Sequence, residues 1–505
     1  MKKGINRNQL RGGVVLSYIS KIIKVVIGLL YTPVMIGLLG QSEYGLYNIA
    51  ASLVAYLGLL NFGFGSSYVR FFSQYKVNGE EKKIENLNAM SLIIFSLMGA
   101  IAVIAGIILS YNVDIFFGAS LSSNEINTAQ TLMRVLVINL AVSFPNIVFD
   151  NYMQANERFI AANILEIIRQ VSSPLLSLPL LLSGWGSLGY VAALTFVNIT
   201  VELLTVYYCF RNLDMKFSLE EFDTSLFKEM SKYSFYIFIN MIVDQVNNNL
   251  DKTILGRYKG TISVAVYSVG ANINSYYTQV STSISNVFTP RIHKMESEQV
   301  SDESFSELFI RVGRVQFVVI ALICTCFFFF GKTFILLWVG EKYINSYWVA
   351  LILMVTVSIA LIQNIGIEIQ RAKNKHQFRS MLYILMAIGN ALISVPLSIK
   401  YGEIGASVGT AISYLLGNGL IMNIYNHKVI GLDIIKFWKE ILKLTPALIL
   451  PILFGSFVTR HVDINKLSVF IVIVVIFVII YLASMWVIGL NEYEKSLVNF
   501  KRRRN

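Results

Sequence analysis

The apolar segment 14–39 carries a polar stripe suited to binding an anion inside a membrane. One face of a helix through this segment would hold Ser17, Lys21, Lys24, Gly28 and Tyr31, at spacings of four, three, four and three residues. A charge near the bilayer centre costs about 3 kcal/mol, so Lys21 and Lys24 are expected to face protein or a water-filled cavity. The alternative is that both lysines lie near the cytoplasmic end of the helix and extend to the lipid headgroups.

A second polar stripe lies in the segment 233–255. One face of a helix here would hold Asn240, Asp244, Asn248 and Asp251, with Asn247 beside them. A carboxylate at membrane depth must find a cation or take up a proton. Asp244 and Asp251 are therefore predicted ion-coupling residues. The alternative for Asp251 is that it lies near the outer end of the helix and is simply solvated.

Further charged residues fall inside predicted spans, and for most of them we expect anchoring at the interface or pairing within the protein. They are Arg134, Asp150, Glu166, Arg169, Glu202, Arg314 and Glu368. Glu166 and Arg169 are three residues apart on a helix, so they are predicted to form an ion pair. Glu368 is a further candidate for coupling to a cation.

The elements that must position these residues are transmembrane helices. The 505 residues are 55% hydrophobic and only 14% charged, whereas a soluble domain carries about 25% charged residues. Apolar runs long enough to cross the bilayer recur along the chain. We predict fourteen spans, at 14–39, 45–68, 89–110, 130–153, 160–183, 188–210, 233–255, 263–288, 310–331, 346–369, 380–399, 404–426, 444–459 and 467–490. The first lacks a signal cleavage site and is expected to be retained.

The distribution of Lys and Arg predicts that both termini are cytoplasmic. With fourteen spans, 29 Lys and Arg residues fall in the segments assigned to the cytoplasm, against seven in the opposite loops. The basic residues 501–504 are interpreted as topology anchors near anionic headgroups, and no nucleic-acid partner is predicted.

The two halves of the chain repeat each other at offsets of 216 to 221 residues. The matching features are Tyr47 with Tyr267, Arg70 with Arg291, and Trp185-Gly186 with Tyr401-Gly402. Arg70 and Arg291 end corresponding spans on the cytoplasmic side, so they are predicted gating residues.

The predicted fold class is an all-α polytopic membrane protein built from two pseudo-symmetric six-helix bundles. The bundles occupy 1–212 and 213–430, and two additional helices with a basic tail occupy 431–505. Halves of this kind, inserted in the same orientation, are typical of alternating-access transporters.

No enzyme is predicted from the sequence. Neither a phosphate-binding G-x-x-x-x-G-K-[ST] loop nor an H-E-x-x-H pattern occurs, so an ATP-driven pump is excluded for this chain alone and no catalytic residue is assigned. Cys209, Cys324 and Cys326 lie in apolar runs, so no disulfide is expected. The four histidines are too widely separated for a zinc site, and no metal is predicted.

The N-terminal hairpin carries the most specific motif. It consists of LLGQSEYGLY at 38–47 and LGLLNFGFGSSYVRFF at 57–72. These segments resemble the start of bacterial polysaccharide flippases of the Wzx type, in the MATE-like superfamily of multidrug, oligosaccharidyl-lipid and polysaccharide exporters. The resemblance implies transfer of an undecaprenyl-diphosphate-linked oligosaccharide across the bacterial cytoplasmic (inner) membrane, for a surface polymer such as an exopolysaccharide.

On this hypothesis the polar residues become substrate ligands. Lys21 and Lys24 would bind the diphosphate. Amides and hydroxyls suit sugars, and the residues predicted to bind the oligosaccharide are Asn240, Asn247, Asn272, Asn274, Tyr276 and Tyr277. The carboxylates leave room for coupling to H⁺ or Na⁺, and no other cofactor is expected. Expected partners are the lipid-linked oligosaccharide, membrane lipids, and the polymerase and glycosyltransferases of the same pathway.

Two alternatives stay open from the sequence. A drug/cation antiporter would share the fold. Fewer spans and an anionic cavity would favour that function, whereas fourteen spans are predicted here and the first of them carries two lysines. A membrane-embedded polysaccharide polymerase or ligase would act on the same substrate, but such enzymes usually carry a large outer loop, and every predicted outer loop here is short.

Overall fold

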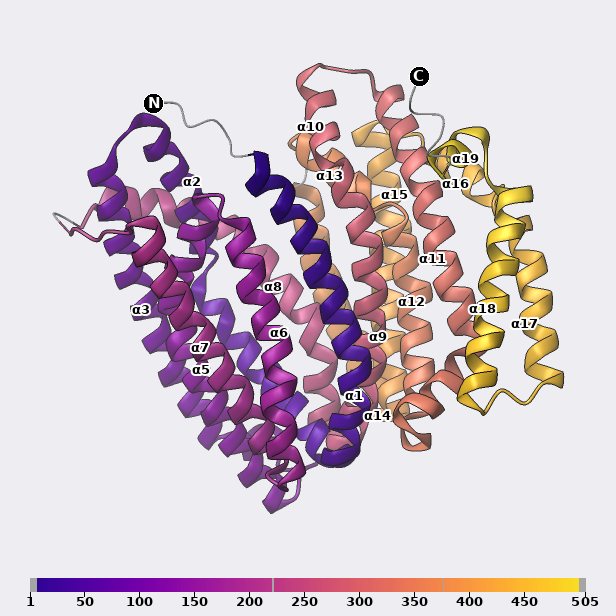
Figure 1. The fold of residues 1–505 in the computed structure, drawn as a ribbon, viewed down its shortest axis with the longest axis horizontal. Coiled ribbons are helices and arrows are strands. Elements are labelled where there is room, and N and C mark those ends of the chain that lie inside the picture. The colour runs from indigo at the N-terminus through magenta and orange to yellow at the C-terminus, as the bar shows by residue number, and fades with distance from the viewer. Residues whose placement is uncertain (1–6, 220–221, 376, 499–505) are drawn as a thin grey trace. The chain divides into compact units, whose positions relative to one another are not determined.

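The computed structural model describes residues 7–219, 222–375 and 377–498, and every regular element in these ranges is a helix. The chain forms two compact units, Met1–Ala265 (unit 1) and Val266–Asn505 (unit 2) (Figure 1). The boundaries predicted at 212 and 430 refer to the sequence repeat and stay a prediction.

Unit 1 contains the long helices that the hydropathy pattern predicts. They are α1 (Arg7–Leu57), α2 (Phe64–Asn78), α3 (Glu81–Tyr111), α4 (Val113–Phe117), α5 (Ser123–Ala155), α6 (Phe159–Leu182), α7 (Gly186–Leu213), α8 (Thr224–Lys259) and the first turn of α9 (Thr261–Ser285), with a 3-10 turn at Gly58–Asn61. Helix α1 packs along α6, and α5 packs against α3 and α7. A capping box starts α5, because the Ser122 hydroxyl accepts from the Glu125 N–H while the Glu125 carboxylate accepts from the Ser122 N–H.

Unit 2 holds the remainder of α9 and the helices that follow. They are α10 (Thr289–Ser297), α11 (Asp302–Val339), α12 (Ser346–Leu361), α13 (Asn364–Ala372), α14 (Gln377–Tyr414), α15 (Met422–Tyr425), α16 (Ile434–Leu442), α17 (Ile449–His461), α18 (Leu467–Ser484) and α19 (Glu492–Val498). Short 3-10 turns occur at Asn286–Phe288, Glu341–Tyr343 and Thr445–Leu448, and π-helical turns at Leu415–Ile421, Asn426–Ile430 and Met485–Gly489. Helices α17 and α18 pack against each other and against α11 (Figure 1).

Two helices are broken by glycines in conformations that other residues rarely adopt. Gly40 interrupts α1 with φ 76° and ψ 174°, and Gly402 interrupts α14 with φ 61° and ψ −137°. Gly186, which the sequence repeat pairs with Gly402, also has a positive φ of 56°. The glycines at this corresponding position of the two halves therefore share an unusual backbone geometry.

By length and composition, ten helical segments of the described chain could cross a membrane. Two of them, Gly12–Asn78 and Gln377–Ile430, each contain two of the fourteen predicted spans, joined across the breaks at Gly40 and Gly402. Helices α8 and α9 cover two more predicted spans, and neither is apolar enough to be among the ten. The count of fourteen and the side of the termini stay predictions.

The core of unit 1 is rich in aromatic side chains where α2, α3, α5, α7 and α8 meet. Tyr68, Phe72 and Phe95 are fully buried, and the Phe72 ring packs edge-on against Tyr152 with centroids 5.3 Å apart. The Tyr68 hydroxyl donates to the side-chain oxygen of Asn88. This buried hydroxyl is thereby satisfied, so it does not weaken the apolar core.

In unit 2, a buried arginine joins α11 to the C-terminal helices. The guanidinium of Arg314 donates to both carboxylate oxygens of Glu494, at 2.6 and 3.0 Å. It also donates to the Glu440 carbonyl at 2.9 Å and to the Gly489 carbonyl at 3.1 Å. Of the two roles expected for Arg314, anchoring or pairing, the structure shows pairing, and these bonds fix α16 and α19 against α11.

Candidate functional site

The turn between α5 and α6 brings polar side chains to the wall of a pocket in unit 1. Helix α5 stops at Asn156, whose side-chain amide donates to the Tyr152 carbonyl at 2.9 Å. Glu157 then adopts a left-handed backbone conformation with φ 57°. The chain reverses within these residues, so that Arg158 and Phe159 at the start of α6 line the pocket.

Helix α1 approaches α6 closely enough to form a second wall. A Cβ added to Gly13 would lie 2.5 Å from the Cβ of Phe159, so any larger residue would push the two helices apart. The Asn163 amide donates to the Gly13 carbonyl at 3.2 Å and to the Phe159 carbonyl at 2.8 Å. These contacts hold the end of α1 in place, and Ser17, one turn further along, lines the pocket.

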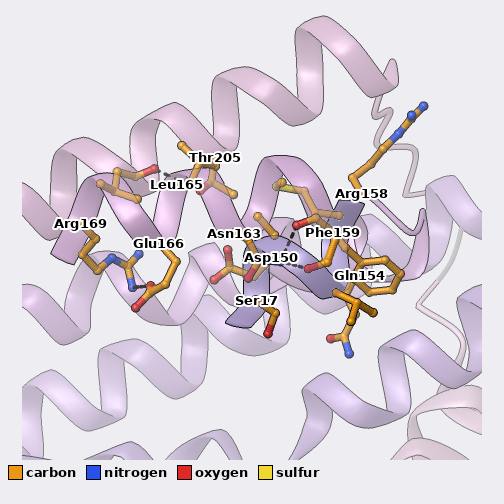
Figure 2. A pocket seen from close by; sticks show the side chains of 15 residues that line it. Ser17, Asp150, Gln154, Arg158, Phe159, Asn163, Leu165, Glu166, Arg169 and Thr205 are labelled. Carbon is orange, nitrogen blue, oxygen red and sulfur yellow. Dashed lines mark hydrogen bonds and ion pairs between the residues drawn. The ribbon is translucent and has the colours of Figure 1, made fainter. Parts of the chain in front are cut away.

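The pocket encloses about 630 Å³ between α1, α5, α6 and α7, a size typical of small-molecule sites. Its lining consists of Gly13, Val14, Ser17, Asp150, Met153, Gln154, Arg158, Phe159, Ala162, Asn163, Leu165, Glu166, Arg169, Val201 and Thr205. Figure 2 shows Arg169 and Glu166 at one end of the pocket, Arg158 at the other and Asp150 between them.

The charges in this pocket are of both signs. Arg169 and Glu166 form an ion pair with Nη1 and Oε2 3.7 Å apart, which confirms the pair predicted from their spacing. Glu166 also accepts from the Gln170 amide at 2.9 Å, while Asp150 is exposed. Guanidinium groups bind phosphate oxygens, and carboxylates and amides bind sugar hydroxyls. The pocket therefore offers groups for both parts of a phosphorylated sugar.

The predicted stripe on α1 faces α6 at both of its ends. Ser17 lines the pocket, and the Tyr31 hydroxyl bonds to the Ser177 hydroxyl of α6. Lys21 is half-buried, Lys24 is exposed, and neither lines the pocket. Their roles in binding the diphosphate stay predictions.

The predicted site residues of α8 differ in burial. Asp251 is only 2% exposed and lies within electrostatic range of Tyr56 on α1. The alternative in which Asp251 is simply solvated is therefore wrong. Asp244 is exposed, and Asn240 and Asn247 are half-buried, so their predicted functions stay open.

On α9, the hydroxyl of one predicted sugar ligand is hydrogen-bonded to neighbouring helices. Tyr277 is 3% exposed, and its hydroxyl shares a hydrogen bond with Ser358 at 2.6 Å and donates to the Ile320 carbonyl at 3.3 Å. The other predicted ligands on this helix are half-buried: Asn272, Asn274 and Tyr276. All four stay predictions as substrate ligands.

The remaining predicted residues lie at the ends of helices. Glu368 pairs with Arg371 at 2.6 Å on α13, so its carboxylate already has a cation in this structure. The Arg70 guanidinium lies 4.7 Å from the centroid of the Tyr233 ring, which joins α2 to α8. Arg291 is exposed on α10. The gating roles of Arg70 and Arg291 stay predictions.

A segment with the G-x-S-x-G pattern of many hydrolases lies inside α14, at residues 405–409. Its serine, Ser407, is fully buried and donates to the Ile404 carbonyl at 2.8 Å. A nucleophile of this type needs an exposed hydroxyl on a sharp turn between a strand and a helix. Ser407 therefore packs the helix and has no geometry for catalysis.

The sequence pattern alone assigns the charged residues of this pocket to anchoring or pairing. The sequence feature that could have indicated a site is the number of charged residues in three consecutive predicted spans. Asp150, Glu166 and Glu202 are three carboxylates on α5, α6 and α7. Arg169 lies three residues from Glu166, while Arg134, the other cation inside these predicted spans, lies 16 residues before Asp150. One ion pair uses one of these carboxylates, so the excess negative charge indicates more than anchoring.

A family model described as "Polysaccharide biosynthesis protein" matches residues 10–296. The chain is also 23% identical over 395 residues to a Shigella flexneri protein named "Putative O-antigen transporter". That match covers 77% of this chain and 90% of the Shigella protein.

Solved structures share the fold over most of the chain. The lipid II flippase MurJ in an inward closed conformation matches with a TM-score of 0.76 and 16% identity, covering 96% of this chain and 99% of that one. An inward-facing multidrug resistance MATE family transporter of the MOP superfamily matches with a TM-score of 0.60 and 16% identity, covering 82% of this chain and 99% of that one. The chain is thus an all-α polytopic membrane protein with the fold of MurJ and of the MATE transporters.

Proposed function

Because the chain belongs to the polysaccharide biosynthesis protein family, we propose that it carries an undecaprenyl-diphosphate-linked oligosaccharide across the bacterial cytoplasmic membrane. The family match confirms the resemblance carried by the N-terminal hairpin, and the shared fold is that of transporters rather than enzymes. The transported molecule would then serve the synthesis of a surface polysaccharide.

The observation that supports this proposal most strongly is the charged pocket of unit 1. Its arginines, Arg158 and Arg169, suit the diphosphate, while Asp150 and Gln154 suit sugar hydroxyls. The ring of Phe159 adds an apolar surface on which a sugar can rest. A pocket of about 630 Å³ holds a diphosphate and the first sugars, not a whole polymer.

An apolar groove in unit 2 suits the lipid tail. It has a volume of about 370 Å³ between α11 and α18, and apart from the Cys326 thiol its lining side chains are aliphatic or aromatic. Phe327 and Phe334 contribute from α11, and Phe470 and Val474 from α18. A polyprenyl chain needs a surface of this kind and no enclosed site, because the lipid bilayer solvates the rest of it.

The proposed mechanism is alternating access. With fourteen spans and cytoplasmic termini, the α5–α6 turn that carries Arg158 lies on the cytoplasmic side, where the lipid-linked oligosaccharide is made. The head group would enter there and leave on the outer side after one half of the protein rocks against the other. The drug/cation antiporter is the second candidate, since MATE transporters share the fold.

Deletion of the gene in its own host tests the proposed substrate. Mass spectrometry of the lipid extract is expected to find an accumulated undecaprenyl-diphosphate-linked oligosaccharide, and the wild-type gene is expected to clear it. Asp150→Asn is expected to restore at most about a tenth of surface polymer, because the pocket loses an acceptor for sugar hydroxyls. Asp114→Asn, the same change at an exposed residue of α4, is the matched control.

Two results would contradict the proposal. Unchanged lipid-linked oligosaccharide in the deletion strain, together with new sensitivity to cationic drugs, would favour the antiporter. Full activity of Asp150→Asn would instead remove the pocket from the substrate path and leave the transported molecule open.

A further inference from the structure

A buried carboxylate lies next to the pocket without adequate hydrogen bonding. Glu202 on α7 is 6% exposed, and its neighbours Val201 and Thr205 line the pocket. Among the described residues, the Glu202 Oε2 atom has no hydrogen-bond partner, and neither does the buried Nε of Arg169. Burying a carboxylate as an anion is costly unless it is paired and hydrogen-bonded.

The groups around Glu202 share a single cation. Asp150 on α5 and Arg169 on α6 lie within electrostatic range of Glu202, and Glu166 holds the only ion pair of Arg169 among the described residues. Arg169 therefore acts electrostatically on three carboxylates. With all three ionised, this group would carry two more negative charges than positive ones, in a region of low polarity.

Among the described residues, the pocket lining supplied by α1 and α7 holds no charged side chain. Lys21 and Lys24 of α1 do not line the pocket, and Arg158 of α6 lies at its other end. Helix α1 contributes Gly13, Val14 and Ser17 to the pocket, none of which is charged. On α7 itself, Cys209 lies two turns from Glu202, and its thiol donates to the Phe149 carbonyl at 3.5 Å.

We propose that Glu202 is a proton-binding site, and that its proton and the Arg169 guanidinium are alternatives. When Glu202 binds a proton from water, the carboxylate becomes a neutral carboxylic acid and Arg169 is released toward Glu166 and Asp150. When the proton leaves, through the exposed carboxylate of Asp150 to solvent, Arg169 returns toward the Glu202 anion. Protonation neutralises the buried group without requiring a coordination shell, and no metal-type cluster of His, Cys, Asp and Glu occurs in the described chain.

One consequence of this exchange rests on the proposed function. Arg169 lines the pocket, so its release by a protonated Glu202 would make the guanidinium available to the diphosphate of the substrate. Loss of the proton would draw Arg169 away and weaken that contact. Proton binding and head-group binding would then be coupled through one side chain.

Infrared spectroscopy of the purified full-length chain in nanodiscs tests the proton site, because a protonated carboxyl has its own C=O band. Titration from about pH 5 to about pH 9 is expected to show a band in wild type that is missing from Glu202→Gln. In Arg169→Gln the band is expected to persist to higher pH, by about one unit or more, because the competing cation is gone. The exposed, ion-paired Glu307 supplies the matched control, and Glu307→Gln should keep the band.

Two outcomes with folded protein overturn the proposal. An identical band in wild type and Glu202→Gln, or no band over the whole range, would assign Glu202 a purely structural role. A spectral change that follows NaCl but not choline chloride at constant pH would identify a metal-cation site instead. If Glu202→Gln fails to fold, the shift in Arg169→Gln decides alone. Because no substrate is added, these results are separate from the test of the proposed function.

Discussion

Two arginines in the two units, one buried and one half-buried, show how differently a protein can treat a cation inside an apolar helix. Arg314 in unit 2 is 4% exposed and has protein acceptors for each of its three guanidinium nitrogens. Arg169 in unit 1 has one ion pair, at 3.7 Å, and a buried Nε with no partner in the described chain. Both lie within long apolar helices, so hydropathy alone does not distinguish them.

The difference indicates which charge is structural and which is functional. A fully bonded guanidinium has one stable arrangement, and Arg314 accordingly joins α11 to the C-terminal helices. An incompletely bonded one has several arrangements of similar energy, and it can change partners when a proton or a ligand arrives. We therefore propose that Arg314 stabilises the fold and that Arg169 acts in transport, and the following substitutions test these two roles.

Arg314→Ala is expected to have the largest effect. It leaves the Glu494 carboxylate, which is 4% exposed, without its cation, and breaking such a pair costs about 3–5 kcal/mol. The variant should reach the membrane in much lower amounts and melt at a clearly lower temperature, as measured by fluorescence-detected size-exclusion chromatography after heating. Arg314→Met combined with Glu494→Met should recover part of the loss, because no unpaired charge remains. A wild-type melting curve for Arg314→Ala would contradict the structural role.

Lys21→Ala combined with Lys24→Ala is expected to abolish transport at normal protein levels. In the described chain Lys24 makes no ion pair and is exposed, so its removal should not affect packing. The measurement is surface polymer in a deletion strain carrying the variant, with membrane levels followed by immunoblot. Lys332→Ala, which removes an exposed lysine near the C-terminal end of α11, is the control. Full complementation by the double variant would leave these lysines as interfacial anchors.

Arg169→Ala is expected to separate transport from stability. Its ion pair is partly exposed, with side-chain exposures of 34% and 43%, and such pairs contribute about 0–1 kcal/mol. The melting temperature should therefore stay close to wild type, while the rate of surface polymer synthesis falls about tenfold because the pocket loses a phosphate ligand. If instead the melting temperature falls as far as in Arg314→Ala, the contrast between the two arginines disappears.

Much of the fold follows from the sequence, since the hydropathy pattern depends on local composition. The predicted spans correspond to helices, and the glycine pair at 186 and 402 could be found from the repeat. The pocket could not be found in this way, because α1 closes it against α5, α6 and α7 from far away in the chain: Gly13 lies 150 residues from its partner Asn163. Likewise, Glu494 lies 180 residues from Arg314. Sequence spacing finds the partner of Arg169, which is three residues away, but it cannot find a partner 180 residues away.

The smallest change expected to be informative is Tyr277→Phe, which removes one hydroxyl from the contact between α9 and its neighbours. The sequence predicts Tyr277 as a sugar ligand, whereas the structure uses its hydroxyl in bonds to Ser358 and the Ile320 carbonyl. If packing is its role, the loss is about 1 kcal/mol of stability, a small fall in melting temperature, and surface polymer at the wild-type level. Tyr276→Phe, at the half-buried neighbouring position, is the matched comparison. A Tyr277→Phe variant that melts like wild type but transports poorly would return this residue to the substrate path. It would also show that a hydroxyl bonded within the protein can act on substrate. The rule that a fully bonded group is structural, inferred from Arg314 and Arg169, would then not hold for neutral groups.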